Sequence, residues 1–158
     1  MFREMMRKKQ QLSAEECVEV LKSQPRGVLS VLGDEGYPYG MPMNHWYCEA
    51  DGKLYFHSGM KGHRTDAMAS CDKASFCVYD EGYRREGEWA LNIRSVIAFG
   101  RLQVVTDEQK VMEFIWQLGE KFTDDKDYLE REIKQAMDHT LIFALEVEHM
   151  TGKLVNEA

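Results

Sequence analysis

The sequence predicts a mainly β domain in which antiparallel strands close into a barrel, with helices at its flanks. About six runs are rich in aromatic and β-branched residues and are joined by short connections. Turn signals such as Asp51-Gly52 join neighbouring runs as hairpins, which favours antiparallel pairing. Two helix-start patterns, at Ser13 and Thr106, place helices between the strands. An antiparallel sheet of this size tends to close on itself.

The chain begins with a predicted helix and a buried strand. Ser13 starts a capping box with Glu16, so we expect a short helix from this point. The helix should end before Pro25, because the residue before a proline disfavours the helical conformation. Residues 27–32, "GVLSVL", are typical of a buried strand, and "GDEG" supplies the turn after it.

Two further strands form a predicted hairpin. Residues 37–50 contain Pro38 and Pro42, which cannot donate to a strand ladder, so we expect an edge or irregular strand. The dipeptide Asp51-Gly52 then turns the chain, and residues 54–58, "LYFHS", return as the next strand.

The middle of the chain alternates helix and strand. Residues 64–71 favour a short helix, and residues 74–80, "ASFCVYD", favour a strand. A polar loop follows over residues 81–89. Residues 90–106 are long and apolar, and Gly100 within them predicts a bulge or bend.

The last third predicts two helices and a closing strand. Thr106 starts a second capping box with Gln109. The helix behind it has an apolar stripe that we assign to Val111, Met112, Ile115, Trp116, Gly119 and Phe122. Residues 125–137 favour a weaker helix, and residues 140–150 favour the closing strand.

Composition limits the classes of partner. The chain has 158 residues, which suits one domain over residues 1–158. A net charge of -7 disfavours nucleic acid, because the phosphate backbone demands a basic surface. No apolar run is long enough to span a membrane. The four cysteines form no CxxC pair, and the His and Cys spacings match no metal motif. We therefore expect reduced thiols in a cytoplasmic protein without a metal.

In the stretch "HSGMKGHRTD", cationic side chains cluster where a predicted strand ends and a predicted helix begins. Helix N-termini present unpaired N–H groups, and glycines allow a backbone to approach an anion closely. The loop contributes Ser58, Gly59, Lys61, Gly62, His63 and Arg64. It is not a P-loop, because GxxxxGK[ST] is absent. The constellation suits a phosphate monoester, and a solvated basic loop is the alternative.

Other candidate residues leave alternatives open. His57 ends a strand, where it faces a ligand or serves as a hydrogen-bonded structural histidine. The neighbours of Pro42 either offer free backbone groups to a ligand or simply form a protected edge. Trp116 is most simply a core or dimer-interface residue. No third residue orients a Cys–His pair, so hydrolysis is not expected.

Five motifs in series resemble one family. They are "GYPYGMPMNHWY", "DGKLYFHSGMKGHRTDAM", "ASFCVYD", "SVIAFGRLQVV" and "EVEHMTGK". In this order they resemble the pyridoxamine 5′-phosphate oxidase-related FMN-binding proteins, in the branch of the nitroimidazole-resistance (Nim) proteins. The resemblance runs from about Arg3 to Lys153. It implies an FMN-binding split β-barrel with a Greek-key antiparallel core and flanking helices, in a homodimer with FMN at the subunit interface.

The resemblance also implies residue roles. Lys61, His63 and Arg64 would hold the FMN phosphate with help from Ser58. The ring and ribityl chain would lie near the other implied residues, which are Pro42, Met43, Asn44, Phe56, His57, Ser95 and Val96. Trp116 of a second subunit would cover part of the ring. His149 and Lys153 would approach the site or seal the barrel.

The resemblance implies a flavin-dependent reductase or nitroreductase that takes electrons from a nicotinamide donor and passes them to a small acceptor. His57 is the candidate catalytic residue, because a histidine beside a flavin can move a proton near neutral pH. Pyridoxamine 5′-phosphate oxidases proper carry a second basic set near the C-terminus for the substrate phosphate, and this set is absent here. The alternatives are a non-catalytic flavin carrier or sensor and a pyridoxamine 5′-phosphate oxidase-like enzyme.

Overall fold

A single antiparallel sheet dominates the computed structural model, which describes residues 1–136 and 139–156. Its seven strands lie in the order β2-β1-β5-β6-β7-β4-β3. The strands are β1 (Arg26–Leu32), β2 (Pro38–Asn44), β3 (Trp46–Cys48), β4 (Lys53–Gly59), β5 (Lys73–Tyr79), β6 (Asn92–Val104) and β7 (Thr140–Asn156). Strands β5, β6 and β7 follow one another, and β4 lies beside β7, which is the Greek-key order. The mainly β prediction is confirmed.

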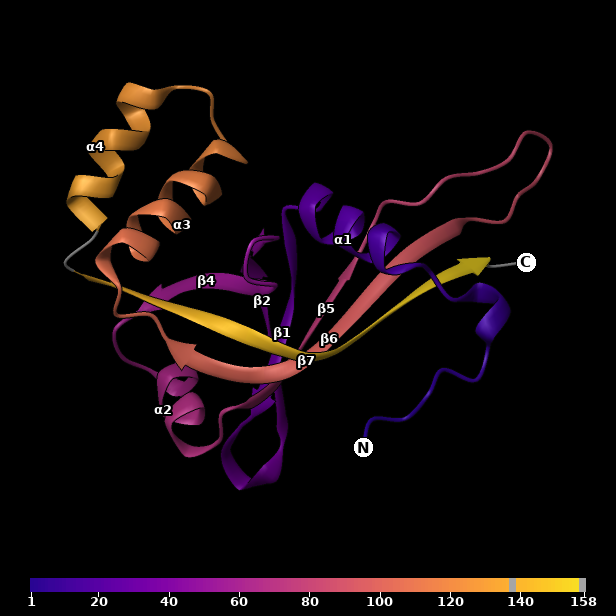
Figure 1. The fold of residues 1–158 in the computed structure, drawn as a ribbon, viewed down its shortest axis with the longest axis horizontal. Helices are drawn as coiled ribbons and strands as arrows, with labels where there is room; N and C mark the ends of the chain where they lie inside the picture. Colours follow the sequence, from indigo (N-terminus) through magenta and orange to yellow (C-terminus); the bar gives the residue numbers. More distant parts are fainter. Residues whose placement is uncertain (137–138, 157–158) are drawn as a thin grey trace.

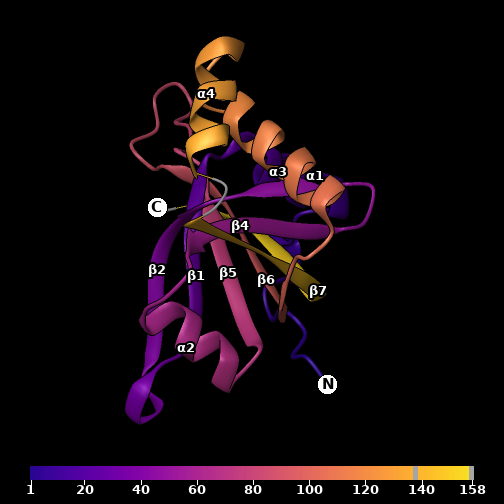
Figure 2. The same cartoon turned by 90° about the vertical axis from the view of Figure 1, so that its left-hand side faces the viewer.

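The sheet curls into a barrel that is split along one side. Strands β1, β5, β6 and β7 stand side by side in Figure 2, and β4 crosses the upper part of this row. Strands β2 and β3 are separated by a single residue, His45, yet lie at opposite edges of the sheet. The sequence analysis treated them as one strand. We call the open side, where β2 faces β4, the seam.

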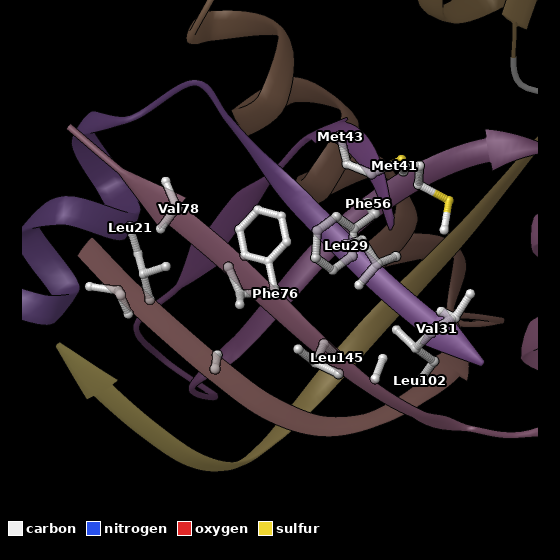
Figure 3. Close-up of a cluster of buried hydrophobic side chains, with 14 of the residues drawn as sticks. Leu21, Leu29, Val31, Met41, Met43, Phe56, Phe76, Val78, Leu102 and Leu145 are labelled. Atoms are coloured by element: carbon white, nitrogen blue, oxygen red, sulfur yellow. The ribbon is translucent and has the colours of Figure 1, made fainter. Parts of the chain in front are cut away.

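The inner face of the sheet holds the main core (Figure 3). Alternate residues of each strand point inward, as the period of two demands. Phe56 is fully buried at its centre, with its ring centroid 5.1 Å from that of Phe76 and 5.3 Å from that of Phe143. Val20 and Leu21 of α1 (Ala14–Ser23) are also fully buried in this core.

Gly100 forms the predicted bulge in β6. Phe99 pairs with His149, but Gly100 pairs with Val147, so β7 gains one residue at this point. A Cβ at Gly100 would lie 2.0 Å from the Glu146 carbonyl oxygen, so only glycine fits without a shift of the backbone. The bulge lets two long strands bend together around the core. Strand β7 continues to Asn156, beyond the predicted end at residue 150, because it stays paired with β6 as far as Asn92.

The structure confirms one predicted helix start and corrects another. The capping box of Ser13 and Glu16 is present at α1. The helix α3 (Glu108–Glu120) instead begins after Asp107, whose carboxylate accepts from the backbone N–H groups of Gln109 and Lys110. The predicted capping box at Thr106 is therefore wrong. A carboxylate one residue later caps the helix and brings negative charge to its N-terminus.

Two helices cover the outer face of the sheet beside the seam (Figure 1). They are α3 and α4 (Lys126–Ala136). Phe114 and Leu118 of α3 are buried against Ile142 of β7 in a second, smaller core. The predicted stripe omitted Phe114 and Leu118 and included Met112 and Trp116, which are only half-buried. Nearly every residue in this part of α3 is apolar, so the period alone does not identify the buried face.

Candidate functional site

The seam opens onto a cavity of about 380 Å³ that lies between the sheet and the helices α3 and α4. Asn44 of β2 and His57 of β4 line its sheet side. The helices supply most of the remaining wall, which is largely apolar and includes Phe114, Leu118, Leu129 and Ile133. The cavity therefore joins a polar edge of the sheet to an apolar interior.

His57 points away from the main core. Its neighbours Phe56 and Ser58 are buried on the inner face, so the alternation of the strand turns His57 outward. The side chain stays partly exposed, yet surrounding protein atoms desolvate the imidazole and lower its pKa. The positive charge of Arg64 lowers this pKa further. His57 is therefore neutral at neutral pH, with one nitrogen as a donor and the other as an acceptor.

Asn44 is held on the opposite side of the seam. Its side-chain oxygen accepts a hydrogen bond of 2.8 Å from the Arg26 Nε–H, on the paired residue of β1. Among the described residues, the amide Nδ2 of Asn44 has no partner. Because β2 is an edge strand, half of its backbone groups point away from β1. Pro42, which lacks an N–H, is exposed on this edge as the sequence predicts.

The basic loop lies at the end of the same strand, β4. It leads into α2 (His63–Ser70), whose N-cap residue is Gly62 with φ 129° and no side-chain cap. This φ favours glycine, and a Cβ at Gly59 or Gly62 would meet nothing within 4 Å. Lys61 is exposed and makes no ion pair or hydrogen bond within the described part of the chain. The first turn of α2 thus presents free N–H groups beside an available ammonium group.

The other two cations of the loop are partly engaged. The His63 ring stacks on Tyr39 with centroids 4.2 Å apart, and its Nε2 lies 3.5 Å from the Asp34 carboxylate. The Arg64 Nε–H lies 2.9 Å from the sulfur of Met41. These contacts hold both side chains at the open side of β2. The positive charge of Arg64 also contributes to the lowered pKa of His57, after burial.

Comparison with known proteins agrees with this arrangement. The model of the pyridoxamine 5′-phosphate oxidase family matches residues 13–154. The chain belongs to this family. A comparison with curated proteins finds no match.

Several solved structures have a fold similar to that of this chain. A proposed 5-nitroimidazole antibiotic resistance protein from Bacteroides thetaiotaomicron is 18% identical, with a TM-score of 0.77 over 92% of this chain and 87% of that chain. A conserved hypothetical protein from Mycobacterium tuberculosis is 16% identical, with a TM-score of 0.80 over 95% and 90%. An FAD-binding protein from Mesorhizobium loti is 23% identical, with a TM-score of 0.68 over 92% and 96%. These likenesses show a shared split-barrel fold.

Several residues implied by the family resemblance point into the core. Met43, Phe56, Ser58 and Val96 are all buried on the inner face of the sheet. Their side chains do not reach the seam, so only their backbone groups are available to a ligand. The reason is the strand period: His57 and Asn44 face outward, which turns their immediate neighbours inward. The resemblance alone does not distinguish the two faces.

Ser95 and Trp116 lie apart from the seam in this chain. Ser95 of β6 pairs with Tyr79 of β5, and β1 stands between β5 and β2, the strand of Asn44. Three strand spacings, about 14 Å, separate Ser95 from Asn44. Trp116 is half-buried on α3 and is not part of the cavity wall.

The two residues of the closing motif lie on the side of β7 next to β6. Lys153 pairs with Ser95, and the His149 ring stacks on Phe2 with centroids 4.7 Å apart. Neither residue is part of the cavity wall. Within one chain they lie on the part of β7 that pairs with β6.

Sequence reasoning missed a buried polar pair behind the seam. Lys121, just after α3, donates 3.0 Å hydrogen bonds to the carbonyls of Gln24 and His45, and burial lowers its pKa to about 8. The fully buried His45 has its Nε2 2.7 Å from the Leu21 carbonyl. Burial, followed by the charge of Lys121, lowers the pKa of His45 to about 3. His45 is therefore neutral and donates to Leu21, which fixes the crossing from β2 to β3.

Two classes of site find no support in the described residues. No three His, Cys, Asp or Glu side chains within residues 1–136 and 139–156 gather where they could hold a metal ion. Over the same ranges, no helix is long and apolar enough to cross a membrane. The cavity at the seam, with its adjoining basic loop, is the candidate functional site.

Proposed function

We propose that this protein is an FMN-binding reductase in which the phosphate of FMN binds at the start of α2 and its ring lies at the seam. One observation supports this most strongly. The uncapped N-terminus of α2, at Gly62, follows the end of β4 by three residues, and His57 lies two residues before that end, about 7 Å along the strand from Gly59. A phosphate monoester and a ring joined by a short chain suit that separation. The family match and the FAD-binding neighbour support a flavin.

The loop would hold the phosphate. The N–H groups at the start of α2 point toward the anion, and the helix dipole favours its negative charge. Lys61 and Arg64 would add charge-assisted hydrogen bonds. His63 is drawn toward Asp34 and Tyr39, so its contribution is smaller than that of the other two cations.

The seam would orient the ring. Asn44 has a free amide N–H₂ group, and the edge of β2 at Pro42 offers backbone groups to the polar rim of a flavin. When bound, FMN supplies the hydride chemistry between a nicotinamide donor and a small acceptor. Neutral His57 would accept a proton from, or donate a hydrogen bond to, the ring's edge.

A homodimer would complete the site. Val28, Tyr79 and Ile97 are exposed apolar residues on the outer face of three neighbouring strands, β1, β5 and β6. Val28 and Ile97 flank Cys77 in one row across the sheet. Apolar surface of this kind is typical of an interface. As the family resemblance implies, a second copy would bring its own Trp116 near the seam, and Trp116 is not part of the cavity wall within one chain.

The direct test is to load the purified protein with FMN and to titrate it anaerobically with NADH and NADPH. A reductase shows a visible flavin band that bleaches with one of the two donors. A flavin that binds but does not bleach favours the carrier or sensor. Turnover of pyridoxamine 5′-phosphate would instead favour the oxidase after which the family is named. Protein that cannot be loaded with FMN would contradict the proposal.

A further inference from the structure

The turn between β1 and β2 lies directly beside the proposed phosphate seat. The Asp34 carboxylate is 3.5 Å from Nε2 of His63, the first residue of α2, and the His63 ring stacks on Tyr39. Gly33 makes this approach possible, because a Cβ there would lie 3.3 Å from the same Nε2 and 3.0 Å from the Cβ of Tyr39. The turn is therefore packed against the start of α2.

The turn carries negative charge and has no cation of its own. Asp34 and Glu35 are adjacent and exposed, and no Lys or Arg occurs between β1 and β2. Within residues 1–136 and 139–156, the ion-pair partner of Asp34 is His63, and Glu35 has none. At least one of the two carboxylates therefore stays uncompensated next to the basic loop.

The backbone at Glu35 is unusual for a residue with a side chain. Its φ of 55° lies in the left-handed region that favours glycine, and the following Gly36 has a φ of 77°. Among the described residues, Glu35 is the one non-glycine residue with a positive φ. Residues held in such conformations cluster at sites where a ligand binds. The outlier therefore motivates the question of what the carboxylate does at the tip of the turn.

The turn lies where a flavin longer than FMN would continue. In both views of the fold it is on the side of α2 away from β4 (Figure 1 and Figure 2). With the ring at the seam and its phosphate at the start of α2, any group attached beyond that phosphate runs toward the turn. In FAD this group is a second phosphate followed by adenosine. The ring of Tyr37 is 75% exposed and offers adenine a surface to stack on, so charge rather than lack of contact opposes FAD.

We propose that Asp34 and Glu35 determine cofactor specificity, because they let the seat accept a terminal phosphate monoester and reject the diphosphate of FAD. This inference rests on the proposed function, since it needs the flavin phosphate at the start of α2. A monoester reaches the helix N-terminus and Lys61 without passing the turn, whereas a second phosphate is brought against two carboxylates. Unpaired charge that repels one of two similar ligands is a general means of discrimination.

Calorimetric titration of the full chain with FMN and with FAD tests the proposal. The wild type should bind FMN about tenfold more tightly than FAD. Asp34→Asn keeps the shape of the side chain but removes its charge, and should reduce this preference about fivefold, chiefly by tightening FAD. Glu86→Gln removes one exposed carboxylate from the loop over residues 81–89 and should leave the preference unchanged. Equal changes in the two variants would overturn the proposal.

Salt separates repulsion from shape. Between about 0.05 M and 0.5 M salt, the preference of the wild type for FMN should shrink, because exposed charges are screened. The double variant Asp34→Asn/Glu35→Gly should show little salt dependence of the preference. The glycine also relieves the backbone at residue 35, so this variant should unfold at a higher denaturant concentration than Asp34→Asn. A wild-type preference that stays constant across the salt range would overturn the proposal.

The two titrations also separate this inference from the proposed function. If the wild type binds FMN and FAD equally well, the specificity inference fails while the proposed FMN site stands. If the wild type prefers FMN and Asp34→Asn does not reduce the preference, the inference fails in the same way. If neither flavin binds, the inference and the proposed function fail together.

Discussion

The two ends of the proposed cofactor site are built in opposite ways. The loop from Gly59 to Arg64 is exposed, cationic and rich in glycine, and it takes its positive field from the start of one helix. The seam is partly buried and apolar, and its histidine is neutral. Strong charge suits a group that must be held, whereas a neutral, partly desolvated edge suits a group that must react. We therefore propose that the loop fixes the ligand and that the seam provides the setting for its chemistry.

The largest expected effect is the loss of FMN affinity when the cations of the loop are removed. The double variant Lys61→Ala/Arg64→Ala should weaken FMN binding by about 2–5 kcal/mol, because two charge-assisted contacts are lost. Quenching of FMN fluorescence measures the affinity. The matched variant Lys8→Ala/Lys9→Ala removes two exposed cations far from the loop and should have little effect. Equal losses in the two variants would show that the loop acts only through net charge.

Low pH should reduce the stability of the protein through His45, which lies behind the seam. Its folded-state pKa of about 3 lies below the ordinary 6.5, so only the unfolded chain takes up this proton as the pH falls below 6.5. Stability is therefore lost between about pH 6.5 and 3, by about 2.7 kcal/mol at pH 4.5. Denaturant unfolding at pH 7 and 4.5 should show a smaller loss in His45→Gln than in the wild type. The control is His139→Gln, which changes an exposed imidazole outside the core and should keep the wild-type loss.

The next largest effect on stability should come from the ammonium group of Lys121, which lies behind the seam. Lys121→Met leaves the carbonyls of Gln24 and His45 without their donor, which should cost about 1–2 kcal/mol in the free energy of unfolding. Because burial lowers the folded pKa of Lys121 to about 8, the wild type should gain on this variant between pH 8 and 10. Lys126→Met, at the start of α4, is the control. A constant difference across that pH range would contradict the buried ammonium.

The smallest expected change concerns His57. His57→Asn should slow electron transfer to the acceptor about tenfold while FMN affinity stays near that of the wild type. Since the folded pKa lies below the ordinary value, the acid limb of the wild-type rate should fall below pH 6.5. Stopped-flow reoxidation across pH measures both. If the asparagine variant keeps the wild-type rate and pH profile, His57 has no part in the chemistry.

Local patterns predicted the fold where neighbours in sequence determine the structure. The capping box at Ser13, the hairpin at Asp51-Gly52 and the bulge at Gly100 each depend on a few adjacent residues or on the lack of a Cβ. The basic loop is of the same kind, so its cationic residues were recognisable directly. The geometry of these features can therefore be predicted from the local sequence.

The seam was less predictable because distant residues build it. The single residue His45 separates strands at opposite edges of the sheet, which no local pattern signals. The inward direction of Phe56 and Met43 follows from the register of the whole sheet. Lys121 reaches carbonyls of Gln24 and His45 that are far away in the chain. Long-range packing determines all three of these features, and the periodicity of the sequence alone does not predict such packing.

Hydrogen–deuterium exchange with and without FMN tests the central claim most directly. Our account predicts that FMN protects two separate stretches, residues 57–66 at the loop and residues 41–46 at the seam. The loop over residues 81–89 projects away from both (Figure 1) and should exchange at the same rate in the two states. Protection confined to other parts of the chain, or of the loop without the seam, would contradict a cofactor that spans the two.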